Sequence, residues 1–272
     1  MNRMKLEGTL KNLCISVIIC WIVLAIIFGF TDLQISIALV NRDAIWANIG
    51  KDFGEGPGYG IIAVSIAILI GSKNDNLKKQ RFASYVILLI GLIILCIALI
   101  FANLWFITFG GGITIVMLIF LIFTKNNDFK KYTTIATVIL LLTIINPLIF
   151  VLITKIMCGR VRFNDLSPGY ANYTPWFLPP GPISGIKGND SFPSGHAAMG
   201  WMFLPLLIQV RERKWTDPIK IIVIILIIGF GVFLGVSRIV TGDHFASDVL
   251  FSTAVAAITT IKLYHRYYIK KK

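Results

Sequence analysis

Charged residues are scarce in this chain. Asp, Glu, Lys and Arg make up 14% of its 272 residues, whereas about 25% is usual in soluble domains. Acidic residues are the rarer sign, with 13 Asp and Glu against 26 Lys and Arg. Hydrophobic residues reach 56% and are grouped into runs long enough to cross a bilayer. The composition excludes an ordinary soluble protein and predicts one membrane-embedded domain over residues 1–272.

Cysteines are also few and lie in or beside apolar runs. The four are Cys14, Cys20, Cys96 and Cys158. Their spacing fits neither a disulfide framework nor a zinc site. No cluster of carboxylates suits another metal ion. We therefore predict a protein without a metal site or other cofactor.

The apolar runs predict an all-α, polytopic bundle of about eight membrane-spanning helices. Their limits are 13–30, 60–71 with an extension back through 54–59, 84–101, 104–123, 133–157, 197–210, 219–236 and 245–264. The first run is longer than a signal-peptide core, so we interpret it as a retained anchor.

Three local features refine this prediction. The connection between the runs 84–101 and 104–123 is very short, which predicts a tight helical hairpin over 84–123. Asn146-Pro147 predicts a kink within the fifth span. Residues 33–49 mix apolar and charged side chains and therefore favour a helix lying in the membrane interface.

The basic residues indicate the orientation. With the N-terminus in the cytoplasm, 19 of the 26 Lys and Arg fall on cytoplasmic segments, as the positive-inside rule requires. The remaining seven are Arg42, Lys51, Lys155, Arg160, Arg162, Lys187 and Arg238. We predict a multi-pass protein of the cell membrane with both termini in the cytoplasm. The net charge of +13 is then an orientation signal and not a nucleic-acid site.

Polar residues gather at the extracytoplasmic ends of four predicted spans. They are Lys155, Arg160 and Arg162 after the fifth span, Ser194 and His196 before the sixth, Arg238 at the end of the seventh, and His244 and Asp248 at the start of the eighth. A single Lys or Arg at such a place can simply reach the lipid headgroups. Convergence of several cations with two histidines and an aspartate predicts a functional site.

Two of these segments have local chemistry. Pro193-Ser194-Gly195 precedes an apolar helix, whose free N–H groups would favour an anion, although Ser194 also suits an ordinary N-cap. If a helix begins near Gly242, His244 and Asp248 share one face. The carboxylate can then fix the imidazole tautomer and leave a nucleophilic nitrogen; a structural cap is the alternative.

Together these groups fit phosphoryl transfer. This chemistry needs cations and N–H donors around the transferred oxygens, an in-line nucleophile and an acid for the leaving group. Lys155, Arg162 and Arg238 supply positive charge, and the two histidines suit the roles of nucleophile and acid.

At these residues the chain resembles the type-2 phosphatidic acid phosphatase (PAP2) superfamily, which also includes vanadium haloperoxidases. The resemblance lies in three ordered blocks: Lys155 to Arg162, Pro193-Ser194-Gly195-His196, and Ser237-Arg238 with His244 and Asp248. It departs from the family pattern at Phe163, where proline is usual. Arg160 competes with Arg162 for the arginine of the first block.

The resemblance implies a role for each matched residue. His244 would be the nucleophile that forms a phosphohistidine, Asp248 would orient it, and His196 would protonate the leaving alkoxide. The phosphoryl oxygens would be held by Lys155, Arg162, Ser194, the Gly195 backbone and Arg238. It also implies a six-helix core, to which the hairpin 84–123 would be an addition.

Two further segments lie on the predicted extracytoplasmic face. Residues 163–190 are rich in Pro, Gly and aromatics, among them Tyr170, Tyr173, Trp176 and Phe177, which either anchor a lid in the interface or line a headgroup pocket. Residues 52–58 also lie on this face.

The predicted function is hydrolysis of a lipid phosphate or diphosphate at the extracytoplasmic face, with the bilayer and a phosphorylated lipid as partners. Undecaprenyl diphosphate, phosphatidylglycerophosphate, phosphatidic acid and lipid A are candidate substrates. The many Ile, Lys and Asn residues are typical of an AT-rich bacterium and favour the first. The alternatives are a transporter or flippase for an anionic lipid or solute, a vanadate-dependent peroxidase, and an inactive scaffold. The oligomeric state cannot be predicted.

Overall fold

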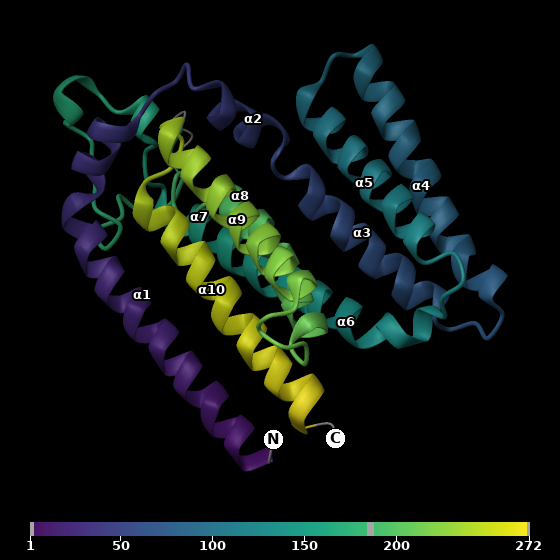
Figure 1. The fold of residues 1–272 in the computed structure, drawn as a ribbon. Coiled ribbons are helices and arrows are strands. Elements are labelled where there is room, and N and C mark those ends of the chain that lie inside the picture. The colour runs from purple at the N-terminus through teal and green to yellow at the C-terminus, as the bar shows by residue number, and fades with distance from the viewer. Residues whose placement is uncertain (1–2, 184–187, 271–272) are drawn as a thin grey trace.

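The computed structural model describes residues 3–183 and 188–270, with side chains from residue 7 onward. Its described part is helical and contains no strand (Figure 1). Three basic residues counted above, Lys187, Lys271 and Lys272, lie outside the described residues.

Six long helices form most of the fold. They are α1 (Arg3–Leu39), α3 (Gly56–Gly71), α4 (Leu77–Ile100), α5 (Leu104–Phe123), α9 (Pro218–Val240) and α10 (Ala246–Tyr264). The shorter α-helices are α2 (Ile45–Phe53), α6 (Thr133–Thr143), α7 (Leu152–Cys158) and α8 (Gly195–Gly200). Short 3₁₀ segments are η1 (Phe129–Tyr132), η3 (Phe163–Asp165), η4 (Pro168–Tyr170) and η5 (Trp201–Val210), and the π-helical ones are η2 (Ile144–Val151) and η6 (His265–Lys270).

Seven helical stretches within the described residues are long and apolar enough to span a membrane. The predicted polytopic helical bundle is therefore confirmed, and the chain is a multi-pass membrane protein. The sixth of the roughly eight predicted spans corresponds to Gly195–Val210, an apolar helical stretch that is shorter than the other seven. Pro205 lies inside this stretch, where the backbone is 3₁₀-helical.

The interfacial helix predicted over 33–49 does not form as one element. Residues up to Leu39 continue α1, and the chain turns before α2 begins at Ile45. The turn is stabilised by the Asn41 side chain, which accepts a hydrogen bond from the Asp43 N–H at 3.1 Å. The Asn41 N–H itself donates to the Val240 carbonyl at 2.8 Å. The end of α1 is thereby held against α9.

The predicted irregularity at Asn146-Pro147 is present. The backbone is π-helical over Ile144–Val151, with Pro147 inside this stretch, because proline supplies no N–H to the helical ladder. Asn146 is buried and its Nδ2 donates to the Ser252 carbonyl at 3.2 Å. This polar contact ties the distorted span to α10.

The predicted hairpin is formed by α4 and α5, both of which are long enough to span a membrane. The pair packs onto the rest of the bundle through α3, as Figure 1 shows. Gly56 of α3 and Gly112 of α5 allow this contact: a Cβ added to Gly112 would lie 2.1 Å from the Gly56 carbonyl oxygen. Small residues of this kind let membrane helices approach backbone to backbone.

The centre of the bundle lies between α3, α6, η5 and α10. Its largest fully buried members include Leu142 and Met202. Helix α1 packs along α10 on the outside, and the two termini lie at the same end of the molecule (Figure 1). This arrangement agrees with termini on one side of the membrane.

Candidate active site

A polar pocket of about 530 Å³ lies where α2, α5, α7, α8 and α9 converge with the segments that precede α3 and α10. Its described lining residues are Lys51, Asp52, Glu55, Leu104, Trp105, Thr108, Lys155, Arg162, Asp190, Gly195, His196, Arg238 and His244. Six of the eight predicted site residues are among them. The other two, Ser194 and Asp248, are fully buried behind the pocket.

His244 is buried in the loop between α9 and α10. Its Nδ1 lies 2.6 Å from the Ser191 carbonyl oxygen. A carbonyl can only accept, so Nδ1 carries the proton and the Nε2 lone pair is available for a substrate. Burial holds the pKa of His244 well below its ordinary value, and the nearby Asp248 carboxylate offsets this only partly. The imidazole is therefore neutral, as a nucleophile must be.

Asp248 lies 3.6 Å from His244 Nδ1 through its Oδ2 atom, which is too long for a hydrogen bond. The same oxygen accepts from the Ser191 hydroxyl at 2.5 Å and from the Phe245 N–H at 2.8 Å. Asp248 and His244 are therefore linked through Ser191, whose hydroxyl donates to Asp248 and whose carbonyl accepts a hydrogen bond from the imidazole N–H.

Arg160 lies behind Asp248 and not in the pocket. Its Nη1 donates to Asp248 Oδ1 at 2.6 Å and its Nη2 to Asp32 Oδ2 at 3.0 Å. Ser247 completes the cluster: its N–H donates to Asp32 Oδ1 at 3.0 Å, and its hydroxyl accepts from Arg160 at 2.9 Å. Since Arg160 is committed to these buried partners, the pocket position belongs to Arg162.

The start of α10 differs from the prediction. The helix begins at Ala246 and not near Gly242, because Gly242 has a φ of 73°, a left-handed conformation that ends α9. His244 therefore precedes the helix, and Asp248 accepts from the N-cap Phe245 N–H. The predicted shared helical face does not exist, although the two side chains still meet.

Ser194 occupies the capping position that its sequence context also allowed. Its hydroxyl accepts from the Ala197 N–H at 3.3 Å, and its carbonyl accepts from the Ser252 hydroxyl at 2.7 Å. The side chain does not line the pocket, whereas the adjacent Gly195 does. This segment therefore offers backbone to the pocket.

Three cations of the predicted set approach the pocket from different elements. Lys155 of α7 donates to the Asp190 carbonyl, and Arg162 pairs with Asp190 Oδ2 at 2.8 Å. Arg238 of α9 pairs with Asp243 Oδ2 at 3.0 Å. Buried donors remain without a hydrogen-bond partner here, namely Nε and Nη1 of Arg238 and Nε of Arg162.

The two acidic partners of these cations are ionised. Burial alone would raise the pKa of Asp190, but Lys155 and Arg162 outweigh it and hold that pKa below its ordinary value. Burial likewise opposes ionisation of Asp243, and Arg238 prevails, so its pKa is also lowered. Both carboxylates fix the cations while leaving donors unused, which suits binding of a doubly charged anion.

His196 is the second residue of α8 and also lines the pocket. Its Nδ1 lies 3.0 Å from Glu55 Oε1, and its Nε2 lies 3.0 Å from the Lys51 carbonyl oxygen. Glu55, Trp105 and Thr108 were not predicted as site residues. The only sequence signal for Glu55 was its place in segment 52–58 on the predicted extracytoplasmic face, while α5 read simply as an apolar run.

The aromatic residues of segment 163–190 pack against neighbouring helices and do not line the pocket. Trp176 Nε1 donates to the Ala25 carbonyl of α1 at 2.8 Å, and Phe177 contacts Phe30 at 5.9 Å between ring centroids. Phe163, which replaces the usual proline, stacks on Tyr170. These contacts attach the segment to α1, and its anchoring in the membrane interface stays a prediction.

Among the residues that the structure describes, no three His, Cys, Asp or Glu side chains form a group that could hold a metal ion.

The chain belongs to the PAP2 superfamily: the model of that family matches residues 136–272. This range includes all eight predicted site residues and confirms the resemblance. Members of this family act on phosphate esters, which supports a phosphatase. Comparisons with curated proteins and with solved structures gave no significant match.

Proposed function

We propose that this protein removes phosphate from a membrane lipid at the extracytoplasmic face, without a metal ion. One observation carries the proposal: the unpaired donors of Arg238 and Arg162 lie in the same pocket as the neutral imidazole of His244. The donors match phosphoryl oxygens, and the imidazole matches an in-line nucleophile. Lipid monophosphates and diphosphates, including undecaprenyl diphosphate, fit this chemistry.

The reaction proceeds in two steps in this proposal. His244 Nε2 forms a bond to phosphorus while the bond to the leaving oxygen breaks, and His196 gives that oxygen a proton. Water then attacks the phosphohistidine and gives a proton back to His196. Lys155, Arg162 and Arg238 hold the phosphoryl oxygens throughout, and Gly195 adds its backbone.

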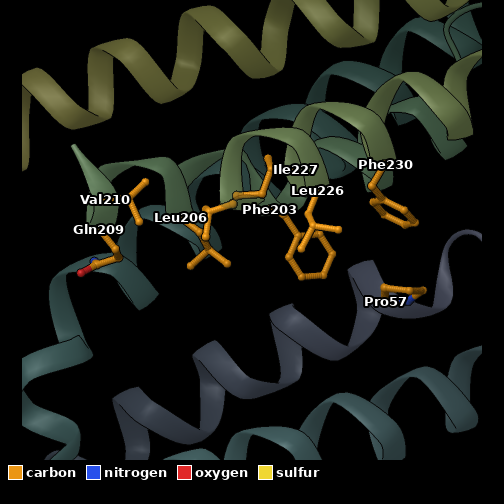
Figure 2. Close-up of a pocket in the computed structure, with 9 residues that line it drawn as sticks. Pro57, Phe203, Leu206, Gln209, Val210, Leu226, Ile227 and Phe230 are labelled. Carbon is orange, nitrogen blue, oxygen red and sulfur yellow. The ribbon is translucent and has the colours of Figure 1, made fainter. Parts of the chain in front are cut away.

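Two apolar cavities that share Pro57 support a lipid substrate. One, of about 560 Å³, is lined by Pro57 of α3 and by residues of η5 and α9. Among these, Phe203 and Leu206 point toward α3 in Figure 2. The other, of about 380 Å³, lies between α3 and the hairpin and shares Thr108 with the polar pocket. Both include Pro57, two residues beyond Glu55. A hydrocarbon chain leaving the polar pocket would meet both cavities here.

The function is tested by phosphate release from a panel of lipid phosphates and diphosphates, using purified protein in detergent with a chelator present. Release from at least one lipid is expected, and the relative rates would rank the substrates. Absence of release from every lipid by folded protein would contradict the proposal. Retention of binding to the same lipids would then favour the transporter.

The cavity of Figure 2 is tested by Leu206→Trp, which fills part of its volume. If the lipid tail lies there, the KM for a long-chain phosphate should rise about tenfold, while that for a short-chain phosphate stays unchanged. This follows because a displaced tail forfeits about 0.8 kcal/mol for each methylene that loses burial. The control is Leu89→Trp, an exposed position on α4 outside both cavities. Equal KM values for Leu206→Trp and the control would place the tail elsewhere.

A further inference from the structure

We propose that Glu55 is a positioning residue for His196, which it holds in the protonated form that a general acid requires. The inference rests on the proposed phosphatase function. It concerns a residue outside the range 136–272 matched by the family model, between α2 and α3. The proposal is based on the contact between Glu55 and His196, which come from two distant parts of the chain.

Both ring nitrogens of His196 face acceptors. Nδ1 lies 3.0 Å from the Glu55 carboxylate, and Nε2 lies 3.0 Å from the Lys51 carbonyl. Neither partner has a proton to offer, so both nitrogens donate only if the ring is the imidazolium. The geometry therefore matches an acid loaded with its proton.

The position of Glu55 is itself fixed. The Tyr59 hydroxyl donates to Glu55 Oε2 at 2.6 Å, so the carboxylate uses one oxygen for Tyr59 and the other for His196. The Tyr59 ring packs edge-on against Phe109 of α5, with 4.9 Å between centroids, and against Trp105 at 6.4 Å. The hairpin thereby supports the residue that orients the acid.

The proton balance follows from this arrangement. Nε2 of His196 gives its proton to the leaving oxygen as the bond between that oxygen and phosphorus breaks. The Lys51 carbonyl, which faces Nε2, lies where the leaving oxygen would accept this proton. Nδ1 remains protonated against Glu55 in the neutral ring. The lone pair left on Nε2 then takes a proton from the water that attacks the phosphohistidine, which restores the imidazolium.

The test is Glu55→Gln, which keeps the shape but removes the charge. For a lipid phosphate with an alkyl leaving group, kcat should fall about 10²-fold, since general acid catalysis contributes about 10²–10⁴-fold, while KM stays within about threefold. For para-nitrophenyl phosphate, whose leaving group needs little protonation, kcat should fall less than about threefold. Glu55→Asp should recover part of the alkyl rate because it restores the charge.

The control is Glu212→Gln, which removes an exposed glutamate that pairs with Arg211, and which should leave both rates unchanged. Equal losses with both leaving groups, or a raised KM with an unchanged kcat on the lipid, would overturn the role of Glu55. If para-nitrophenyl phosphate is not hydrolysed by the parent protein, the kcat and KM values on the lipid decide. Absence of all hydrolysis by the parent would instead contradict the phosphatase function.

Discussion

Replacement of His244 by alanine is expected to lower phosphate release by at least about 10³-fold, because loss of a nucleophile removes the covalent route altogether. The side chain is buried, and its Nδ1 donates to the Ser191 carbonyl. KM should change little, since the cations and not the imidazole hold the phosphate. Rapid quenching of the parent with labelled lipid should also trap an acid-labile phosphate on the protein, and the variant should show none.

The chain offers a matched control in His265, which lies at the other end of α10, at the start of η6. His265→Ala should release phosphate at the parental rate. A thermal melt of each variant in detergent checks that all three proteins are folded. Equal release by the parent and by folded His244→Ala would remove His244 from the role of nucleophile while leaving the hydrolase class open.

Arg160→Met is expected to give the largest loss of stability, about 3–5 kcal/mol, which is typical when one partner of a buried ion pair is removed. Arg160 is 1% exposed and its partners Asp32 and Asp248 are 0% exposed, so two buried carboxylates would lose their counter-charge. Its guanidinium also lies 4.0 Å from the Phe245 ring centroid. Chemical denaturation in mixed micelles measures the change.

Arg213→Met serves as the comparison, because Arg213 also pairs with an aspartate, Asp217, but at an exposed position. Exposed pairs contribute little to stability, so this variant should unfold like the parent. If Arg160→Met and Arg213→Met had the same stability, the buried cluster would not hold α1 to α10. A second variant, Asp32→Asn, should destabilise the protein less, since it leaves Arg160 paired with Asp248.

Much of the fold was predictable because long apolar runs have few alternatives in a bilayer. Helix spans, the hairpin and the irregularity at Pro147 all followed from local sequence. The prediction for segment 33–49 was wrong, because its polar side chains were taken as a sign of a helix in the membrane interface. Asp32, just before it, is instead buried against Arg160, which is 128 residues away. Contacts at such separation leave no local pattern.

The sequence predicted which residues meet at the site but not their local geometry. Span ends brought Lys155, Arg162, Arg238, His196 and His244 to one pocket, as expected. The start of α10 was misplaced because Gly242 resembles a helix start in sequence but adopts a positive φ. The acceptor for His244 was also missed, because a backbone carbonyl such as that of Ser191 has no sequence signature.

The glycine contact between Gly56 and Gly112 has a consequence for engineering. Nearly all of the hairpin's attachment runs through α3. Its helix α5 also lines the polar pocket with Trp105 and Thr108 and packs on Tyr59, which fixes Glu55. A chimera that exchanges the rest of α4 and α5 for another hairpin, with Gly112 and the α5 residues that contact Tyr59 kept, should therefore retain phosphate release and change which lipid is accepted.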